Sequence, residues 1–78
     1  MEKNKIIKII FEREGKQFAA YPVTELELKE AKDGFALMGL DINNCNCGTE
    51  ACWNGFWWIC SLDLNNQCVW YRSDWQCN

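Results

Sequence analysis

The sequence predicts an α+β fold in one small domain: an N-terminal β-hairpin, one helix, a cysteine-bearing loop and a C-terminal β-hairpin. Three observations predict it, namely strand-like runs around a glycine turn, a helical repeat behind a capping box, and two further strand-like runs around adjacent asparagines. A chain of 78 residues buries too little surface to form two domains. Residues 1–42 and 43–78 differ in composition, but no linker separates them, so we treat them as two parts of one fold.

The N-terminal hairpin is predicted from residues 6–11 and 18–23, which are rich in β-branched and aromatic side chains. Gly15 lies between these runs and accepts the positive φ that a tight turn needs. Pro22 is expected to end the second strand, because proline cannot donate a ladder hydrogen bond. The apolar start of the chain is interpreted as a strand and not as a signal peptide, since Lys8 interrupts it and no small-residue cleavage site follows.

The helix is predicted to begin at Thr24, which forms a capping-box pattern with Glu27. Apolar residues then recur on one helical face at Leu28, Ala31, Phe35 and Met38. The helix could end at Gly34, with residues 35–42 forming a strand, or continue to Gly39; the longer helix is preferred. A solvated face is expected for the acidic side chains Glu25, Glu27, Glu30 and Asp33.

The C-terminal hairpin is predicted from residues 56–64 and 67–76, which flank Asn65 and Asn66. Adjacent asparagines tolerate the left-handed backbone of a two-residue turn. In that register the core face carries Phe56, Trp58, Cys60, Leu62, Leu64, Val69, Tyr71 and Trp75. The opposite face carries Trp57, Ile59, Cys68 and Trp70. This second face is unusually aromatic for a surface, so we expect a partner or another part of the chain to cover it.

All six cysteines follow residue 44, and the first three have the spacing C-x-C-x4-C at Cys45, Cys47 and Cys52. With Gly48 and Gly55, residues 45–55 resemble the zinc-binding post-SET loop that follows the catalytic domain of many histone lysine methyltransferases. The resemblance implies that Cys45, Cys47 and Cys52 bind a structural zinc ion, with a fourth thiolate from Cys60, Cys68 or Cys77. Cys68 is chosen as the fourth ligand. The methyltransferase activity does not carry over, because its catalytic domain cannot fit in the remaining length.

Two alternatives to zinc stay open for the cysteines: a disulfide framework, as in small secreted proteins, and free buried thiols. The predicted register places Cys60 and Cys68 on opposite faces, so these two should not pair with each other. A cytoplasmic location follows from the interpretation of the N-terminus, and a secreted one if the cysteines form disulfides. No run of about twenty apolar residues predicts a membrane span.

The composition favours binding over catalysis. The net charge is −3 and no basic stripe is present, which makes nucleic-acid binding a weak candidate. With no histidine in the chain, a cysteine nucleophile lacks its usual base, so we predict that the protein is not an enzyme. Exposed aromatic residues favour association, and the predicted partner-binding residues are therefore Trp57, Trp70 and Arg72.

The function predicted from these features is that of a small protein-binding module, an inhibitor or adaptor, whose partner is a larger enzyme or complex. A mobile-element protein that blocks a host enzyme would have this form, and an uncovered aromatic face also suits a homodimer. One alternative is a zinc-loop module that binds a nucleotide or nucleic acid by aromatic stacking. A second alternative is a secreted disulfide-rich effector.

Overall fold

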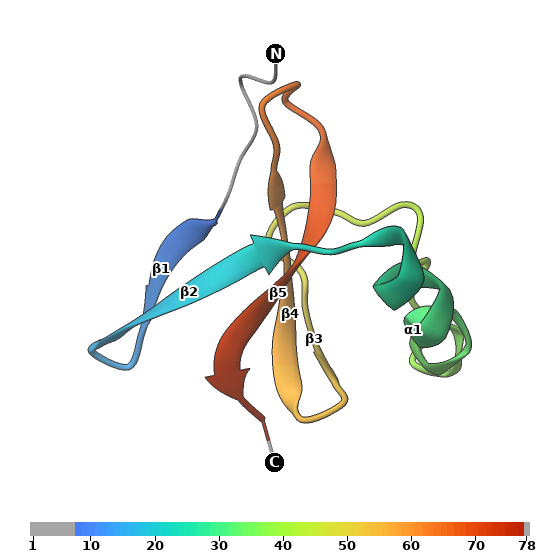
Figure 1. Ribbon diagram of the computed structural model, residues 1–78, viewed down its shortest axis with the longest axis horizontal. Coiled ribbons are helices and arrows are strands. Elements are labelled where there is room, and N and C mark those ends of the chain that lie inside the picture. Colours follow the sequence, from blue (N-terminus) through green and yellow to red (C-terminus); the bar gives the residue numbers. More distant parts are fainter. Residues whose placement is uncertain (1–7, 78) are drawn as a thin grey trace.

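The computed structural model describes residues 8–77, which form one helix and a five-stranded antiparallel sheet (Figure 1). The elements are β1 (Ile9–Arg13), β2 (Lys16–Pro22), α1 (Glu25–Leu37), β3 (Glu50–Trp53), β4 (Phe56–Leu62) and β5 (Cys68–Gln76). The strand order is β1-β2-β5-β4-β3, so β5 lies at the centre of the sheet. The α+β fold with a hairpin at each end of the chain is confirmed.

The N-terminal hairpin forms around a two-residue turn at Glu14 and Gly15. Both residues have positive φ, 55° and 79°, as a turn matching the strand twist requires. Arg13 pairs with Lys16 beside the turn, and the ladder runs back to Ile9 opposite Ala20. The first strand was predicted at residues 6–11; positions 6 and 7 lie outside the described residues.

The longer of the two predicted helices is the one that forms. The Thr24 hydroxyl accepts from the Glu27 amide, and the Glu27 carboxylate accepts from the Thr24 amide, which completes the capping box. At the other end Gly39 has φ 79°, and the Leu40 amide donates to the Phe35 carbonyl as in a Schellman motif. The helix therefore ends just before Gly39 and passes through Gly34.

Gly34 has a packing role inside the helix. A Cβ at this position would lie 2.0 Å from the Trp53 ring, so the indole of β3 packs directly on the glycine backbone. Because the strand and the helix approach so closely here, glycine is required although it weakens an isolated helix.

Replacing Gly34 with alanine is expected to lower the free energy of unfolding by about 1–3 kcal/mol, because the overpacked Trp53 ring must move. Alanine's higher helix propensity, about 1 kcal/mol, offsets only part of this. Urea denaturation measures the loss, and a double-mutant cycle with Trp53→Ala provides the control. In the Trp53→Ala background the same change should be neutral or stabilising. An equal cost in both backgrounds would show that the indole is not the cause.

The strand β3 was not predicted, since its residues fall within the expected cysteine-bearing loop. Asn54 and Gly55 form its turn into β4, with φ of 55° and 87°. Asn-Gly between apolar runs is the strongest short-range hairpin pattern, so the sequence did contain this information. The C-terminal part of the chain is thus a three-stranded meander and not a single hairpin.

The predicted register of the last hairpin is wrong by one residue. Leu62 pairs with Cys68 and Cys60 pairs with Trp70. The Asp63 carboxylate accepts from the amides of Asn65 and Gln67, and Asn66 alone has positive φ, so the loop has three residues in place of two. A one-residue shift moves one strand's side chains to the other face. Trp70 therefore shares a face with Trp58.

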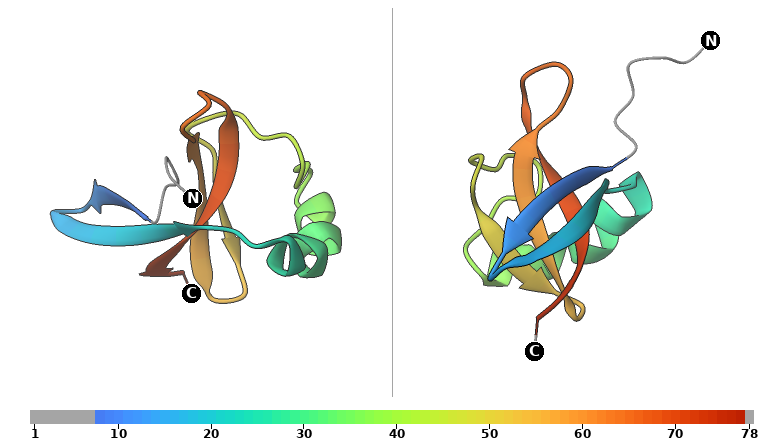
Figure 2. Two further views of the ribbon diagram at one scale, coloured as in Figure 1. Left: turned by 45° about the horizontal axis from the view of Figure 1, so that its top comes forward. Right: turned by 90° about the vertical axis from the view of Figure 1, so that its left-hand side faces the viewer.

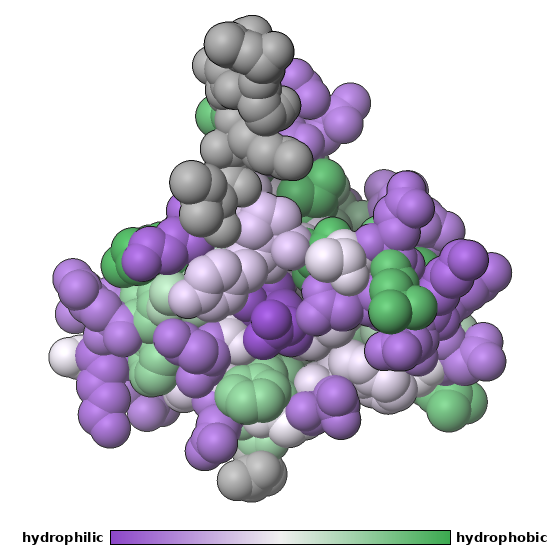
Figure 3. Space-filling view, viewed as in Figure 1, coloured by the Kyte–Doolittle hydropathy of each residue, from purple (hydrophilic) through white to green (hydrophobic). Residues whose placement is uncertain are grey.

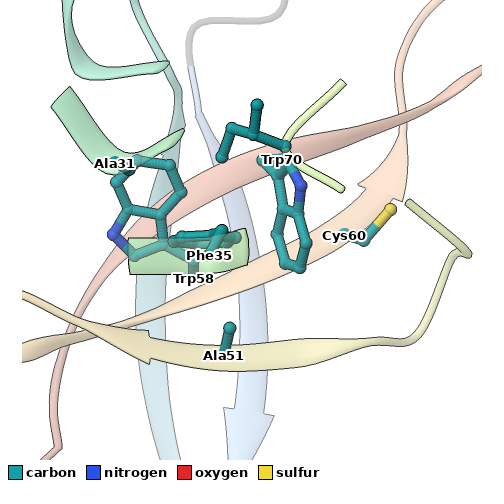
Figure 4. Close-up of a cluster of buried hydrophobic side chains, with 7 residues drawn as sticks. Ala31, Phe35, Ala51, Trp58, Cys60 and Trp70 are labelled. Atoms are coloured by element: carbon teal, nitrogen blue, oxygen red, sulfur yellow. The ribbon is translucent and has the colours of Figure 1, made fainter. Parts of the chain in front are cut away.

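The main core lies between α1 and the face of the sheet that carries these two tryptophans (Figure 4). Phe35 is fully buried between them, with its ring centroid 5.0 Å from both Trp58 and Trp70. Ala31 and Ala51 complete the packing from the helix and from β3. Helix and sheet are thus held together by aromatic contacts from three elements.

A second aromatic cluster lies on the opposite face, where the N-terminal hairpin folds across β3, β4 and β5 (Figure 2). It consists of Phe11, Phe18, Trp57 and Trp75, all half-buried, with neighbouring ring centroids 5.2–6.2 Å apart. An ion pair between Arg13 and Glu50 joins the two edge strands β1 and β3. The sheet is therefore bent around this cluster, and the N-terminal hairpin covers the second aromatic face.

Candidate functional site

The six cysteines form three disulfides, which corrects the zinc prediction. Cys45 pairs with Cys60, Cys47 with Cys68, and Cys52 with Cys77. The four predicted zinc ligands, Cys45, Cys47, Cys52 and Cys68, are thereby divided among three bonds, and no free cysteine remains. Zinc binds thiolates, and oxidised sulfurs lack the charge that it needs. The alternative of a disulfide framework describes this chain, and the similarity to the post-SET loop stays one of spacing.

Two of the disulfides attach the loop between α1 and β3 to the sheet. Cys45–Cys60 and Cys47–Cys68 lie side by side, and the Sγ atoms of Cys47, Cys60 and Cys68 are all within 4.8 Å of one another. Cys60 and Cys68 do not pair with each other, as expected, but they share a face and are not on opposite faces as predicted. Cys52–Cys77 joins β3 to the residue after β5.

The three predicted partner-binding residues do not form one surface. Trp70 is only 4% exposed and packs in the main core, so a partner cannot reach it in the folded protein. Trp57 is half-buried against Trp75, 5.5 Å between ring centroids, on the other face of the sheet. Trp57 was predicted to lie beside Trp70, but because the register is shifted by one residue its neighbour is Trp75.

Arg72 links β5 to the start of the helix. Its Nε donates to the Glu27 carboxylate at 2.9 Å. Glu27, the third residue of the helix, thus takes part in both the capping box and this ion pair. Burial raises the pKa of Glu27, but the Thr24 amide and the Arg72 guanidinium outweigh that effect, and the pKa lies below its ordinary value of 4.5. The ionised carboxylate thus favours the folded state.

Replacing Glu27 with glutamine is expected to cost about 0.5–1 kcal/mol of unfolding free energy at pH 7, because glutamine keeps the cap but loses the charge on a half-exposed ion pair. A carboxylate whose pKa is lowered by folding stabilises above its unfolded pKa and loses that contribution as the pH falls through the folded value. Urea midpoints of wild type and Glu27→Gln should therefore differ at pH 7 and converge well below pH 4.5. A difference that persists at pH 2.5 would contradict this explanation.

A groove of about 630 Å³ runs between the end of β2, the start of α1, residues 42–45 and the loop from β4 to β5. In Figure 1 these segments surround the upper part of β5. The wall is mostly apolar, with side chains that include Val23, Leu28, Ile42, Leu64, Val69 and Tyr71. Its volume lies within the range of ligand-binding clefts. Sequence reasoning missed this site, because its walls come from four separate segments.

The rim of the groove carries exposed apolar side chains. Leu64 is 55% exposed at the tip of the β4–β5 loop, and Tyr21 is 39% exposed at the end of β2. Elsewhere strongly hydrophobic residues form separate patches among hydrophilic ones, as the face in Figure 3 shows. Apolar side chains around a concave surface favour association with another molecule. The groove is therefore the best candidate site among the described residues.

Comparison of the chain with protein-family models, with curated proteins and with solved structures finds no match. Within residues 8–77, α1 is too short and too polar to cross a lipid bilayer.

Proposed function

We propose that this protein is a small, non-enzymatic binding module, an inhibitor or adaptor, that recognises a protein partner through the groove beside β5. The observation that carries the proposal is a preformed apolar groove with exposed leucine and tyrosine side chains at its rim. Two of the three disulfides, Cys45–Cys60 and Cys47–Cys68, fix segments around it, which lowers the entropy that binding would cost. They also support action in an oxidising environment, as a secreted protein.

The nucleotide-binding alternative receives less support. Aromatic stacking needs an accessible ring with a cation nearby for the phosphate. Trp70 is buried, and the Arg72 guanidinium is paired with Glu27. A protein partner requires neither of these groups.

The proposal is tested by selecting a phage-displayed library of random 12-residue peptides on the oxidised protein. We expect peptides that bind the wild type and lose at least tenfold affinity for the Leu64→Arg variant, which places a charge in the groove rim. Leu37→Arg is the matched control, because Leu37 is 90% exposed and lies at the end of α1, outside the groove lining. Peptides that bind the two variants equally, or a library with no binders, would refute recognition through this groove.

A further inference from the structure

Two of the disulfides differ in how far a reagent in solution can reach them. In the outer bond, Cys47 is exposed and Cys68 is half-buried. In the inner bond, Cys60 is 1% exposed within the main core and Cys45 is half-buried. A thiolate opens a disulfide by attacking one of its sulfur atoms, which it must first reach. Cys47 therefore offers an incoming thiolate its entry, whereas Cys60 is closed to it.

The sulfur atoms of the outer and inner bonds form a cluster. The Sγ atoms of Cys47, Cys60 and Cys68 lie within 4.8 Å of one another, and the Sγ of Cys45 is outside this set. Cys60 and Cys68 approach each other from adjacent strands, where they are diagonal neighbours on one face of the β4–β5 ladder. Whichever sulfur the opening of the outer bond sets free thus lies beside Cys60, on the inner bond, and not beside Cys45.

The inner bond is the covalent link between β4 and one wall of the groove. Residues 42, 43 and 45 of the loop line the groove, and Cys45 is bonded to β4 through Cys60. The next part of the loop is held without covalent bonds, since the Gly48 amide donates to the Cys60 carbonyl and the Cys60 amide donates to the Thr49 carbonyl. Release of Cys45 therefore frees the wall and leaves the chain from Gly48 onward in place.

We propose that the outer bond is an exchange site for a small thiol such as glutathione, and that the exchange continues to Cys60 and releases Cys45. The incoming thiolate bonds to the Sγ of Cys47, and the outer bond breaks with Cys68 leaving as a thiolate. The Sγ of Cys68 then attacks the Sγ of Cys60, which forms a Cys60–Cys68 disulfide and expels Cys45 as a thiolate. Each step forms one S–S bond and breaks one, and Cys45 finally takes a proton from water.

The third disulfide provides an internal control. Cys52 is exposed, so the same thiol can open its bond to Cys77. Within residues 8–77, no third cysteine sulfur joins these two in a cluster. Exchange at this bond should stop after its first step.

The first experiment treats the oxidised, full-length protein with glutathione at mildly alkaline pH, at low protein concentration and without oxygen. Samples are quenched with acid, labelled with a maleimide, digested without reduction and mapped by mass spectrometry. We expect glutathione on Cys47 and the maleimide first on Cys68, with about a tenth or more of this label moving to Cys45 over time. Label that stays on Cys68, or glutathione attached only to Cys52, would overturn the proposal.

The second experiment needs no external thiol. Cys47→Ser leaves Cys68 as a thiol beside the inner bond, whereas the matched control Cys77→Ser leaves Cys52 as a thiol outside the cluster. The maleimide should mark both Cys68 and Cys45 in the first variant and Cys52 alone in the control. An unlabelled Cys45 in Cys47→Ser protein that is folded by circular dichroism would refute the exchange, and so would equal scrambling in both variants. If Cys47→Ser does not fold, the wild-type experiment decides.

Discussion

Complete reduction of the three disulfides is expected to unfold the protein at room temperature and neutral pH. The bonds close loops with sequence separations of 15, 21 and 25 residues. On the chain-entropy model each such bond stabilises a small domain by about 3 kcal/mol, which gives roughly 10 kcal/mol for three. Domains of ordinary stability have about 5–15 kcal/mol in total, and a chain this short lies at the lower end.

Thermal melts followed by circular dichroism and tryptophan fluorescence measure this effect, with and without a phosphine reductant. The oxidised protein should show a cooperative transition, and the reduced protein should show none. The matched control is the oxidised protein at the same reductant concentration after the reagent has been quenched. A cooperative melt of protein whose six thiols are all alkylated would show that the apolar cores suffice without the bonds.

The order of reduction follows from burial. Cys60 is 1% exposed, within the main core, whereas Cys47 is exposed and its partner Cys68 is half-buried. A reductant must reach a sulfur atom, so Cys47–Cys68 should be cleaved before Cys45–Cys60. Limited reduction, alkylation and peptide mass mapping identify the first bond lost.

Replacing Phe35 with alanine is expected to cost about 3–5 kcal/mol, because the ring is fully buried among three indoles and its removal leaves a cavity between helix and sheet. The disulfides should keep the variant folded enough for its unfolding to be measured in urea. Near-ultraviolet circular dichroism should weaken as well, since Trp58 and Trp70 lose the ring that separates them.

The control for this prediction is Phe18→Ala, the same change in the second aromatic cluster. Phe18 is half-buried and stacks on Trp75 with 5.2 Å between ring centroids, so less apolar surface is lost. The loss of stability should be clearly smaller than for Phe35→Ala. Equal losses would mean that the two clusters contribute equally to stability, against the burial difference.

Local patterns in the sequence predicted the local structure well. Thr24 and Glu27 are three positions apart and interact wherever a helix starts, so the capping box was readable without knowledge of the fold. Gly15 identified its turn for the same reason. Asn54 and Gly55 form an equally clear hairpin-turn pattern, but the cysteine spacing around them favoured an irregular loop.

The register of β4 and β5 depends on whether the loop between them has two or three residues, and the turn preferences of asparagine alone do not decide this. Asp63 decides it, since its carboxylate binds two amides across the turn and favours the three-residue form. The prediction placed Trp70 on the second face, where the structure has Trp75, because it assumed a loop that is one residue too short. It explains why the sequence predicted an aromatic second face correctly but assigned the wrong tryptophan to it.

The oxidation state and pairing of the cysteines could not be predicted from the sequence. Six cysteines allow fifteen pairings, and their oxidation depends on the environment in which the chain folds. The groove was equally inaccessible to prediction. Val23, Ile42, Leu64 and Val69 meet there only after β2 and β5 have paired and two disulfides have fixed the connecting loop.

The central position of β5 also determines the order in which this protein can assemble during synthesis. The hairpin of β1 and β2 leaves the ribosome early, but its neighbour in the sheet arrives more than fifty residues later, when Ser73 meets Ala20. Contacts so distant along the chain slow folding, because a long loop must close before any of them stabilises it. Until β5 is synthesised, Phe11 and Phe18 in the hairpin lack their contact with Trp75 and stay exposed. Chaperone binding at that stage would protect the hairpin from aggregation.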